Sequence, residues 1–328
     1  MLKKSITIIG GSTQDIMYYT DQALILDNKK DLLRKKLIAF EYGTKIHSDK
    51  VYFSYGGGGA NTAVTLAALG LKTKLISSVG HDAVGHDLMA NLRRRGVNVS
   101  AVQTRRQYRT ALSLVVNVGA SHEHVLFSYR GANDHLELGE KIIRQIKTNW
   151  IYLNSLAKIS SPQLADFFQR AKARKIKLAW NPDARQLSWG LRRISKCLNK
   201  NLVLIVNRDE ALGLVSSLGK IKIKNNIRFL FKKLHYGQYL TVITDGPRGA
   251  YVYDGSEIYF RAATNHKPIS TLGAGDAFGS GFIGGLIRYH NNIKKALNLG
   301  ILNSGLVVSK IGAQAGIVTK QYLKQHHL

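Results

Sequence analysis

The sequence predicts an α/β fold in which a mainly parallel β-sheet is covered by helices on both faces, forming a three-layer αβα sandwich. Short, nearly continuous apolar runs alternate with helical segments of about ten to fifteen residues, which is typical of strands buried on both faces of a parallel sheet. The chain has no internal repeat, low-complexity tract or proline-rich linker, and its four prolines mark no boundary between sequential domains. Its 328 residues, 45% of them hydrophobic, are enough to bury a large core.

Strands and helices are expected to alternate along most of the chain. Strand-like apolar runs stand at residues 6–11, 73–80, 150–156, 176–182, 201–207 and 239–246. Helical segments are expected at residues 59–70, 81–97, 162–175 and 208–219, and a glycine-rich helix begins within 271–286. Helices between successive strands indicate parallel strand pairs.

Two stretches, 15–55 and 109–130, interrupt this alternation. The first is rich in polar residues, and the second contains two consecutive strand-like runs, 111–118 and 124–129, joined by a short turn at 119–121. We therefore expect one domain spanning residues 1–328, with lid segments at about 12–55 and 108–130 that form a small extra sheet. The alternative is that these segments are fixed surface strands or a dimer contact, so a homodimer formed through the lid stays open.

The charge of the chain is strongly positive. Lys and Arg number 48 and Asp and Glu 20, which gives a net charge of +28 at pH 7. The basic residues occur in small groups along the whole chain, without an aromatic-interleaved stretch or a nucleic-acid motif. This distribution favours a solvated basic surface that attracts anionic nucleotides, and no specific nucleic-acid partner is expected.

The N-terminus and the cysteine content indicate a cytoplasmic protein. Too few apolar residues precede Gly10 for a signal peptide, and no run of about 18 apolar residues predicts a membrane span. The single cysteine, Cys197, excludes an internal disulfide, and no nearby histidine suggests a nucleophilic role.

The stretch 271–286 carries the clearest chemical signal. Asp276 follows the small-residue turn Gly273-Ala274-Gly275, whose backbone N–H groups can converge on an anion at the positive end of a helix. A carboxylate beside such an anion hole suits phosphoryl transfer, because it can take the proton from an attacking hydroxyl. The alternative is a closely packed helix start in which Asp276 is an ordinary first-turn carboxylate.

A second glycine cluster lies at residues 55–70. It lacks the Lys-Ser/Thr ending of a P-loop and the spacing of a dinucleotide-binding fingerprint. The glycines lead into a helix, and Asn61 offers both a donor and an acceptor to hydroxyl groups, so a sugar suits this loop. A flexible hinge before a helix is the alternative.

Four motifs together carry a family resemblance. The segments GGGGANTAVTLAALG (56–70) and STLGAGDAFGSGF (270–282) resemble the two signatures of ribokinase-like (PfkB-type) carbohydrate kinases. Between them, NRDE (207–210) is similar to the family's NxxE motif, and TDGPRGA (244–250) is similar to its TxGxxG nucleotide loop. All four occur in the family's order and span nearly the whole chain.

The resemblance implies a ribokinase-like αβα sandwich with a small β-sheet lid, and ATP-dependent phosphorylation of an alcohol. It makes Asp276 the general base, while the backbone amides of Gly273, Ala274 and Gly275 stabilise the transferred phosphoryl group. Glu210 is implied to hold Mg²⁺ through water. The residues implied to bind the nucleotide are Asn207, Thr244, Gly246, Gly249 and Asn303. For Asn207 and Glu210 the alternative is a helix-capping pair.

On the acceptor side, the resemblance implies binding by five residues: Asp15, Gly57, Gly58, Asn61 and Asn133. Asp15 can accept two hydrogen bonds from a diol. The motifs do not identify the sugar. A nucleoside kinase of the same family is the main alternative, and a non-catalytic sugar or nucleotide sensor is a further one. Ser270 replaces an aspartate that helps form a monovalent-cation site in ribokinases, so activation by potassium stays open.

Overall fold

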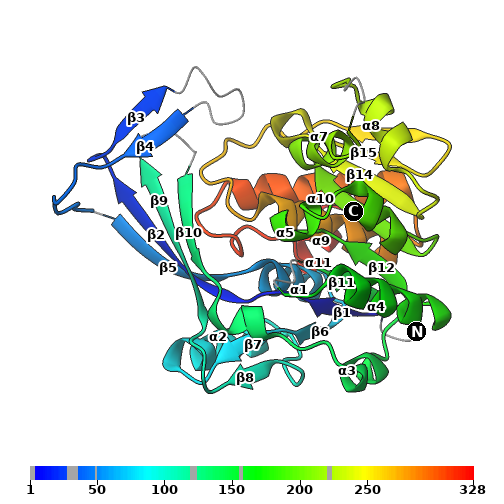
Figure 1. Ribbon diagram of the computed structural model, residues 1–328, viewed down its shortest axis with the longest axis horizontal. Coiled ribbons are helices and arrows are strands. Elements are labelled where there is room, and N and C mark those ends of the chain that lie inside the picture. Colours follow the sequence, from blue (N-terminus) through cyan, green and yellow to red (C-terminus); the bar gives the residue numbers. More distant parts are fainter. Residues whose placement is uncertain (1–3, 28–35, 49, 119–123, 155–157, 220–223) are drawn as a thin grey trace.

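The computed structural model describes residues 4–27, 36–48, 50–118, 124–154, 158–219 and 224–328. Two β-sheets organise these residues: a large sheet buried between helices, and a smaller one that projects from it at the left of Figure 1. In this part of the chain, no helix is long and apolar enough to cross a membrane.

The large sheet contains eight strands, of which the first six in spatial order are parallel. Its order is β6 (Lys72–Ile76), β1 (Ser5–Ile9), β11 (Trp150–Leu153), β12 (Lys177–Trp180), β13 (Leu202–Asn207), β14 (Leu240–Thr244), β15 (Ala250–Tyr253) and β16 (Ile258–Arg261). β15 pairs antiparallel with β14, and β16 pairs antiparallel with β15. The expected strand at 73–80 divides after Ile76, because Ser78–Gly80 form β7, which pairs with β8 (Gln103–Arg105) instead.

Helices cover both faces of this sheet, and each face has its own core. Alternate side chains of one strand point to opposite faces, so Tyr152 of β11 packs into one core and Ile151 and Leu153 into the other. The Tyr152 side carries α1 (Gly58–Ala68), α2 (Ala83–Arg94), α9 (Ala274–Arg288) and α10 (Ile293–Val308). The opposite side carries α4 (Ser161–Ala173), α7 (Arg208–Ser216) and α8 (Ile227–Leu234), with the short helices α3 (Glu140–Gln145), α5 (Ala184–Leu187) and α6 (Leu191–Ile194). The predicted three-layer sandwich is confirmed.

The small sheet contains four strands from the two stretches that interrupt the alternation. Its order is β10 (His124–Tyr129), β9 (Ala111–Val118), β2 (Thr13–Thr20) and β5 (Lys50–Gly56), with β2 and β9 parallel. A separate antiparallel pair, β3 (Leu24–Asp27) and β4 (Lys36–Ala39), lies beyond it (Figure 1). The turn expected at 119–121 lies outside the described residues.

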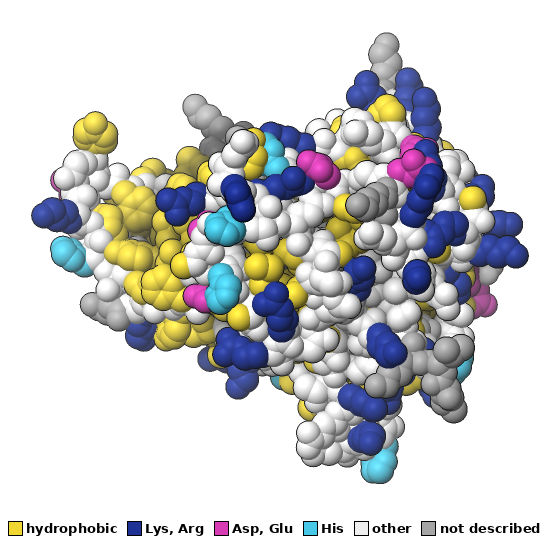
Figure 2. All heavy atoms as spheres, turned by 90° about the horizontal axis from the view of Figure 1, so that it is seen from below, with side chains coloured by type: hydrophobic (Ala, Val, Ile, Leu, Met, Phe, Trp, Pro, Cys, Tyr) yellow, Lys and Arg dark blue, Asp and Glu magenta, His cyan; other side chains and the backbone are white. Residues whose placement is uncertain are grey.

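The two faces of this small sheet differ in chemistry. Register places Asp15 opposite Ser54 of β5 and Ser113 of β9, so these side chains share a face. A Cβ at Gly312 would lie 3.8 Å from the Ser54 side chain, so this face looks toward the large domain. The other face carries exposed apolar side chains such as Phe53 and Phe127, and Figure 2 shows apolar side chains gathered over this end of the molecule.

Glycines allow the N-terminus of α1 to touch the end of β1. Gly57 has φ = 90°, and a Cβ there would lie 2.6 Å from the carbonyl oxygen of Gly11. A Cβ at Gly59 would lie 2.5 Å from the carbonyl carbon of Gly10. Any larger residue would push the helix away from the strand, so the glycine cluster sets where α1 begins relative to the sheet.

Candidate active site

Polar residues gather where the parallel strands end. Asn154 follows β11, Asn207 ends β13 and Thr244 ends β14. Helices α1 and α9 begin nearby, since a Cβ at Gly58 would meet both Asn154 and Asp276. The carboxyl edge of a parallel sheet is where ligands bind in open α/β folds.

Asp276 lies in the first turn of α9, and both of its carboxylate oxygens accept a hydrogen bond from an amide. Asn61 Nδ2 donates to Oδ2 at 2.9 Å, and Asn154 Nδ2 donates to Oδ1 at 3.3 Å. Burial raises the pKa of the Asp276 carboxyl, and the hydrogen bond from Asn61 opposes that rise. The result is a desolvated carboxylate held in a fixed orientation, as a general base requires.

Asn154 is a site residue that the sequence motifs did not single out. It is 2% exposed and also donates to Thr62 Oγ1 at 3.1 Å, which ties β11 to α1. A Cβ at Gly58 would lie 2.6 Å from Asn154 Nδ2 and 3.2 Å from Asp276 Oδ1. The available signal was positional: Asn154 is the first polar residue after a buried central strand.

The turn before α9 has open backbone N–H groups, but one of the expected donors is engaged. Gly273 has φ = 78°, and a Cβ there would overlap the Cβ of Ala313. The N–H of Ala274 donates within the turn to Thr271 O at 3.2 Å, so it is engaged in this state. Within the described chain, the N–H groups of Gly273, Gly275 and Asp276 donate to no protein acceptor. Gly273 and Gly275 therefore have open donors as expected, while Asp276 replaces Ala274 as the third.

Asp15 lies on the domain-facing side of the small sheet and is 4% exposed. Burial raises its pKa to about 6, hydrogen bonds from Thr13 and Ser113 oppose this, and the charge of Asp276 adds to it. A Cβ at Gly56 would overlap the Asp15 carboxylate, so a glycine there gives the carboxylate room. Ser54 Oγ, across from Asp15, is buried without a partner among the described residues.

Two asparagines expected to bind the acceptor already have protein partners. Asn61 uses Nδ2 on Asp276 and accepts from Gln314 Nε2 at Oδ1, at 3.1 Å. Asn133 accepts from the N–H of Ser12 at 3.1 Å and donates to its carbonyl at 3.0 Å. In the structure Asn61 orients the Asp276 carboxylate, and Asn133 fixes the loop after β1. Acceptor binding by either remains a prediction.

The NRDE segment adopts the capping arrangement named above as its alternative. Asn207 Oδ1 accepts from the N–H of Glu210, and Glu210 Oε2 accepts from the N–H of Asn207, both at 2.8 Å. Burial raises the pKa of Glu210, and the hydrogen bond from Asn207 opposes this. Since Glu210 Oε1 is not used in the cap, capping and water-mediated metal binding are compatible.

Asp245, inside the TDGPRG loop, forms an ion-pair cluster that the motifs did not predict. Its side chain is 2% exposed and lies between Arg208 of α7 and Arg248. Arg248 Nη2 donates to Oδ1 at 2.6 Å, and Arg208 Nη1 donates to Oδ2. The hydrogen bond from Arg248, with that from Arg208, holds the pKa of Asp245 below its usual range. The cluster joins the NRDE helix to the loop.

The other nucleotide-loop residues have a backbone role in the structure. Thr244 ends β14, Gly246 has φ = 53°, and Gly249 has φ = 110°. A Cβ at Gly249 would overlap the carbonyl of Arg261. Arg261 also borders a cavity of about 440 Å³ that continues along α10 past Thr264 and Leu302. The loop therefore contacts a strand residue that borders this cavity, although Thr244, Gly246 and Gly249 do not line it.

Asn303 is fully buried and bridges helices. Its Nδ2 donates to Ala277 O at 2.7 Å, and its Oδ1 accepts from the N–H of Val318 at 2.8 Å. These contacts support the helix that carries Asp276. Nucleotide contact by Asn303 stays a prediction.

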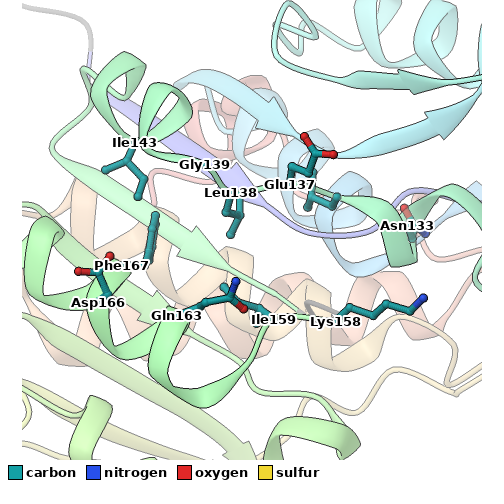
Figure 3. Close-up of a pocket in the computed structure, with 11 residues that line it drawn as sticks. Asn133, Glu137, Leu138, Gly139, Ile143, Lys158, Ile159, Gln163, Asp166 and Phe167 are labelled. Atoms are coloured by element: carbon teal, nitrogen blue, oxygen red, sulfur yellow. The ribbon is translucent and has the colours of Figure 1, made fainter.

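Two further observations concern metal binding and a neighbouring cavity. No group of three or more His, Cys, Asp or Glu side chains that could hold a metal occurs within the described ranges. Glu210 suits Mg²⁺ all the same, because this ion keeps most of its waters and often uses one carboxylate together with substrate phosphates. A cavity of about 400 Å³ between η1 (Gly131–His135) and α4 has Asn133 at its edge but includes neither Asp276 nor its partners Asn61 and Asn154 (Figure 3).

A half-buried carboxylate beside a helix N-terminus, at the carboxyl edge of a doubly covered parallel sheet, is an arrangement suited to phosphoryl transfer. The family model described as "pfkB family carbohydrate kinase" matches residues 29–320. The chain belongs to this family, and it is an ATP-dependent carbohydrate kinase.

Individual relatives differ in their named acceptors. The chain is 26% identical to an ATP-dependent 6-phosphofructokinase of Thermoanaerobacterium thermosaccharolyticum, over 90% of this chain and 93% of that protein. The ribokinase of Cryptococcus neoformans in complex with ADP superposes with a TM-score of 0.78 at 19% identity, covering 98% and 99% of the two chains. A Burkholderia thailandensis nucleoside kinase in complex with inosine gives 0.76 at 15%, covering 98% and 97%. The predicted family and ribokinase-like fold are confirmed.

Proposed function

We propose that this kinase transfers the γ-phosphoryl group of ATP to a hydroxyl of a sugar or sugar derivative, with Asp276 as general base. One observation carries the proposal: both Asp276 oxygens are oriented by amide donors directly beside the open N–H groups of the α9 N-terminus. The carboxylate takes the acceptor's proton as the hydroxyl attacks. The N–H groups of Gly273, Gly275 and Asp276, with the helix dipole, stabilise negative charge on the transferred group. The N–H of Ala274 would join these donors if phosphate binding breaks its hydrogen bond to the carbonyl oxygen of Thr271.

ATP would bind across the strand ends on the other side of α9. Thr244, Gly246 and Gly249 would present backbone groups to the phosphates and ribose of ATP. The cavity that begins at Arg261 would receive the adenine ring. Mg²⁺ neutralises phosphate charge and would be held through water by Glu210, with Asn207 fixing that side chain. Asn303 supports the first turns of α9 through its hydrogen bond to the carbonyl oxygen of Ala277.

The acceptor would lie between the small sheet and the N-terminus of α1. Asp15 accepts hydrogen bonds from two hydroxyls, and Gly57 and Gly58 give the acceptor access to the base. The hydroxyls of Ser54 and Ser113 flank Asp15 on the same face. A row of small hydroxyl side chains suits a polyhydroxylated acceptor, so these two residues extend the site proposed from the motifs. Asn133 holds the adjoining loop.

A nucleoside acceptor is the second candidate, favoured by one aromatic pair. Tyr19 and Tyr52 pack edge to face at the outer end of the small sheet, with ring centroids 5.7 Å apart. Tyr52 stands opposite Met17, on the same face as Asp15. A nucleobase would contact these rings, whereas a sugar would not reach them.

The small sheet would serve two further purposes. As a lid, it closes over the acceptor and excludes water from the phosphoryl group. Its outer face exposes Val51, Phe53, Val125 and Phe127, each at least 38% exposed. Apolar patches of this kind are typical of protein contacts, so we propose a homodimer formed through the lid.

Two measurements test the proposed reaction. ADP release is followed with D-ribose, D-fructose, fructose 6-phosphate and adenosine, which separates sugar, sugar phosphate and nucleoside acceptors. With the best acceptor, Asp276→Asn should lose about 10²–10⁴-fold in turnover while keeping its fold and most of its nucleotide affinity. Asp21→Asn, at an exposed position, is the control. Near-normal turnover of Asp276→Asn would exclude Asp276 as the base, and binding without turnover of any acceptor would favour the sensor.

A further inference from the structure

We propose that Gln314, in the loop between α10 and α11 (Lys320–Gln325), is a positioning residue that sets which end of the Asn61 amide faces Asp276. The inference rests on the proposed function, in which Asp276 is the base. None of the motifs includes Gln314, and it lies 253 residues from Asn61 in the sequence.

A continuous hydrogen-bonded chain links the loop to the base. Gln314 Nε2 donates to Asn61 Oδ1 at 3.1 Å, and Asn61 Nδ2 donates to Asp276 Oδ2 at 2.9 Å. Asn61 is 5% exposed, so water does not readily replace either partner. In the observed orientation Gln314 donates through Nε2, so Asn61 turns its oxygen toward Gln314 and its nitrogen toward the carboxylate, which can only accept.

The direction of the Asn61 amide decides whether it helps or opposes the base. An N–H donor favours the ionised carboxylate, which is the form that accepts a proton. With the amide turned round, Asn61 Oδ1 would face Asp276 Oδ2, and two acceptors would meet in a desolvated place. That contact is relieved only by protonating Asp276, which removes the base.

The second oxygen of Asp276 does not compensate. Asn154 Nδ2 donates to Oδ1 at 3.3 Å and to Thr62 Oγ1 at 3.1 Å, so its contact with the carboxylate is longer than the 2.9 Å contact of Asn61. Asn61 is the better donor to the carboxylate. Loss of its orientation therefore removes the larger share of the hydrogen bonding to Asp276.

The backbone around Gln314 is itself held in place. Arg95, at the end of α2, donates from Nη2 to the carbonyl oxygen of Gln314 at 2.8 Å. The N–H of Ala315 donates to Gly312 O at 3.1 Å, which closes a turn around Gln314. The loop is thus anchored independently of Asn61, as a positioning residue requires.

Two other titratable side chains, on neighbouring elements, are affected by the charge of Asp276. Asp15 lies on β2 of the lid, and Tyr152 lies beneath on β11 with a buried hydroxyl that has no partner among the described residues. The negative charge of Asp276 raises the pKa of each, after burial as the larger cause. Neither contacts Gln314, so changes at Gln314 leave both groups in place.

The test is a pair of substitutions that remove or reverse the orienting contact. Gln314→Met keeps the length of the side chain but donates no hydrogen bond. Gln314→Glu keeps the shape but only accepts, so it binds Asn61 Nδ2 and turns the amide round. The control is Gln321→Met on the exposed face of α11. For each variant kcat/KM is measured from pH 5 to 9 with whichever of D-ribose, D-fructose, fructose 6-phosphate or adenosine the wild type phosphorylates best.

The base works above its pKa, so a raised pKa moves the acid limb of kcat/KM to higher pH. We expect a shift of about half to one pH unit for Gln314→Met and a larger one, with a plateau loss of about 10-fold or more, for Gln314→Glu. Gln321→Met should match the wild type. In an Asn61→Ala background, the neutral change Gln314→Met should have no further effect on the limb.

The outcomes separate this inference from the proposed function. If Asp276→Asn keeps its turnover, the proposed base fails and the inference fails with it. If Asp276→Asn is inactive but both Gln314 variants keep the wild-type acid limb, the inference alone is overturned. A merely structural role for Gln314 would lower the melting temperature and the rate equally at every pH, and that result also overturns it. Should Gln314→Glu not fold, the Gln314→Met profile and the Asn61→Ala cycle still decide.

Discussion

Substitution of Gly275 by alanine should separate ligand binding from folding. Gly275 is the second residue of α9, and a Cβ there meets no protein atom within 4 Å. Since glycine is unfavourable in helices, Gly275→Ala should stabilise the protein by up to about 1 kcal/mol. For 328 residues, with an unfolding entropy of roughly 2.1 cal/mol/K per residue, this raises Tm by about 1–2 °C.

The same methyl group would stand where the phosphoryl group meets the open N–H donors. Loss of one oxyanion donor costs about 10²–10³-fold in kcat in other enzymes, and we expect about 10²-fold here. The assay combines ADP release at saturating ATP and acceptor with thermal unfolding. A variant that is more stable and nearly inactive is the expected result.

Two other glycines calibrate this experiment. Gly213 of α7 also has nothing within 4 Å of an added Cβ, so Gly213→Ala should gain similar stability with unchanged turnover. Gly273 has φ = 78° and would clash with Ala313, so Gly273→Ala should lose about 1–3 kcal/mol of stability. If Gly275→Ala keeps the wild-type kcat and KM, no phosphate passes through this turn and the reasoning is refuted.

Three further predictions concern the lid and the nucleotide loop. In the folded protein the pKa of Asp15 is raised from 3.8 to about 6. Ionisation of Asp15 therefore lowers the free energy of unfolding by up to roughly 3 kcal/mol above pH 6, and this loss disappears as the pH falls toward 3.8. Asp15→Asn should therefore gain in Tm relative to wild type as pH rises from 4 to 7; a pH-independent difference would contradict the raised pKa. Asp245→Asn leaves Arg208 and Arg248 without their carboxylate and should raise the KM for ATP several-fold more than that for the acceptor; equal effects would argue against a loop-positioning role. Phe127→Lys on the outer lid face should shift a dimer toward monomer in light scattering, and an unchanged mass would place any dimer contact elsewhere.

The motifs located the proposed base and the glycine turns because these features are local. Asp276 follows its turn directly, and the positive φ of Gly273 and Gly249 needs glycine whatever surrounds it. The alternation of apolar strands and helices likewise reflects local periodicity, and the sheet and its two helical layers agree with it. The order of the strands needs long-range pairing, which periodicity does not contain.

The partners of the site residues were decided by the tertiary structure. Asn61, Asn133 and Asn303 look alike in the sequence as candidate ligand contacts, yet each amide is engaged by a different distant group. Asn154 and Gln314 carry no motif and reach the base region only through the packing of β11 and the loop before α11. The sequence by itself determined that a carboxylate stands at a helix start in an α/β kinase fold. Which amides orient that carboxylate depends on contacts between residues 122 to 253 positions apart, and only the folded chain brings these together.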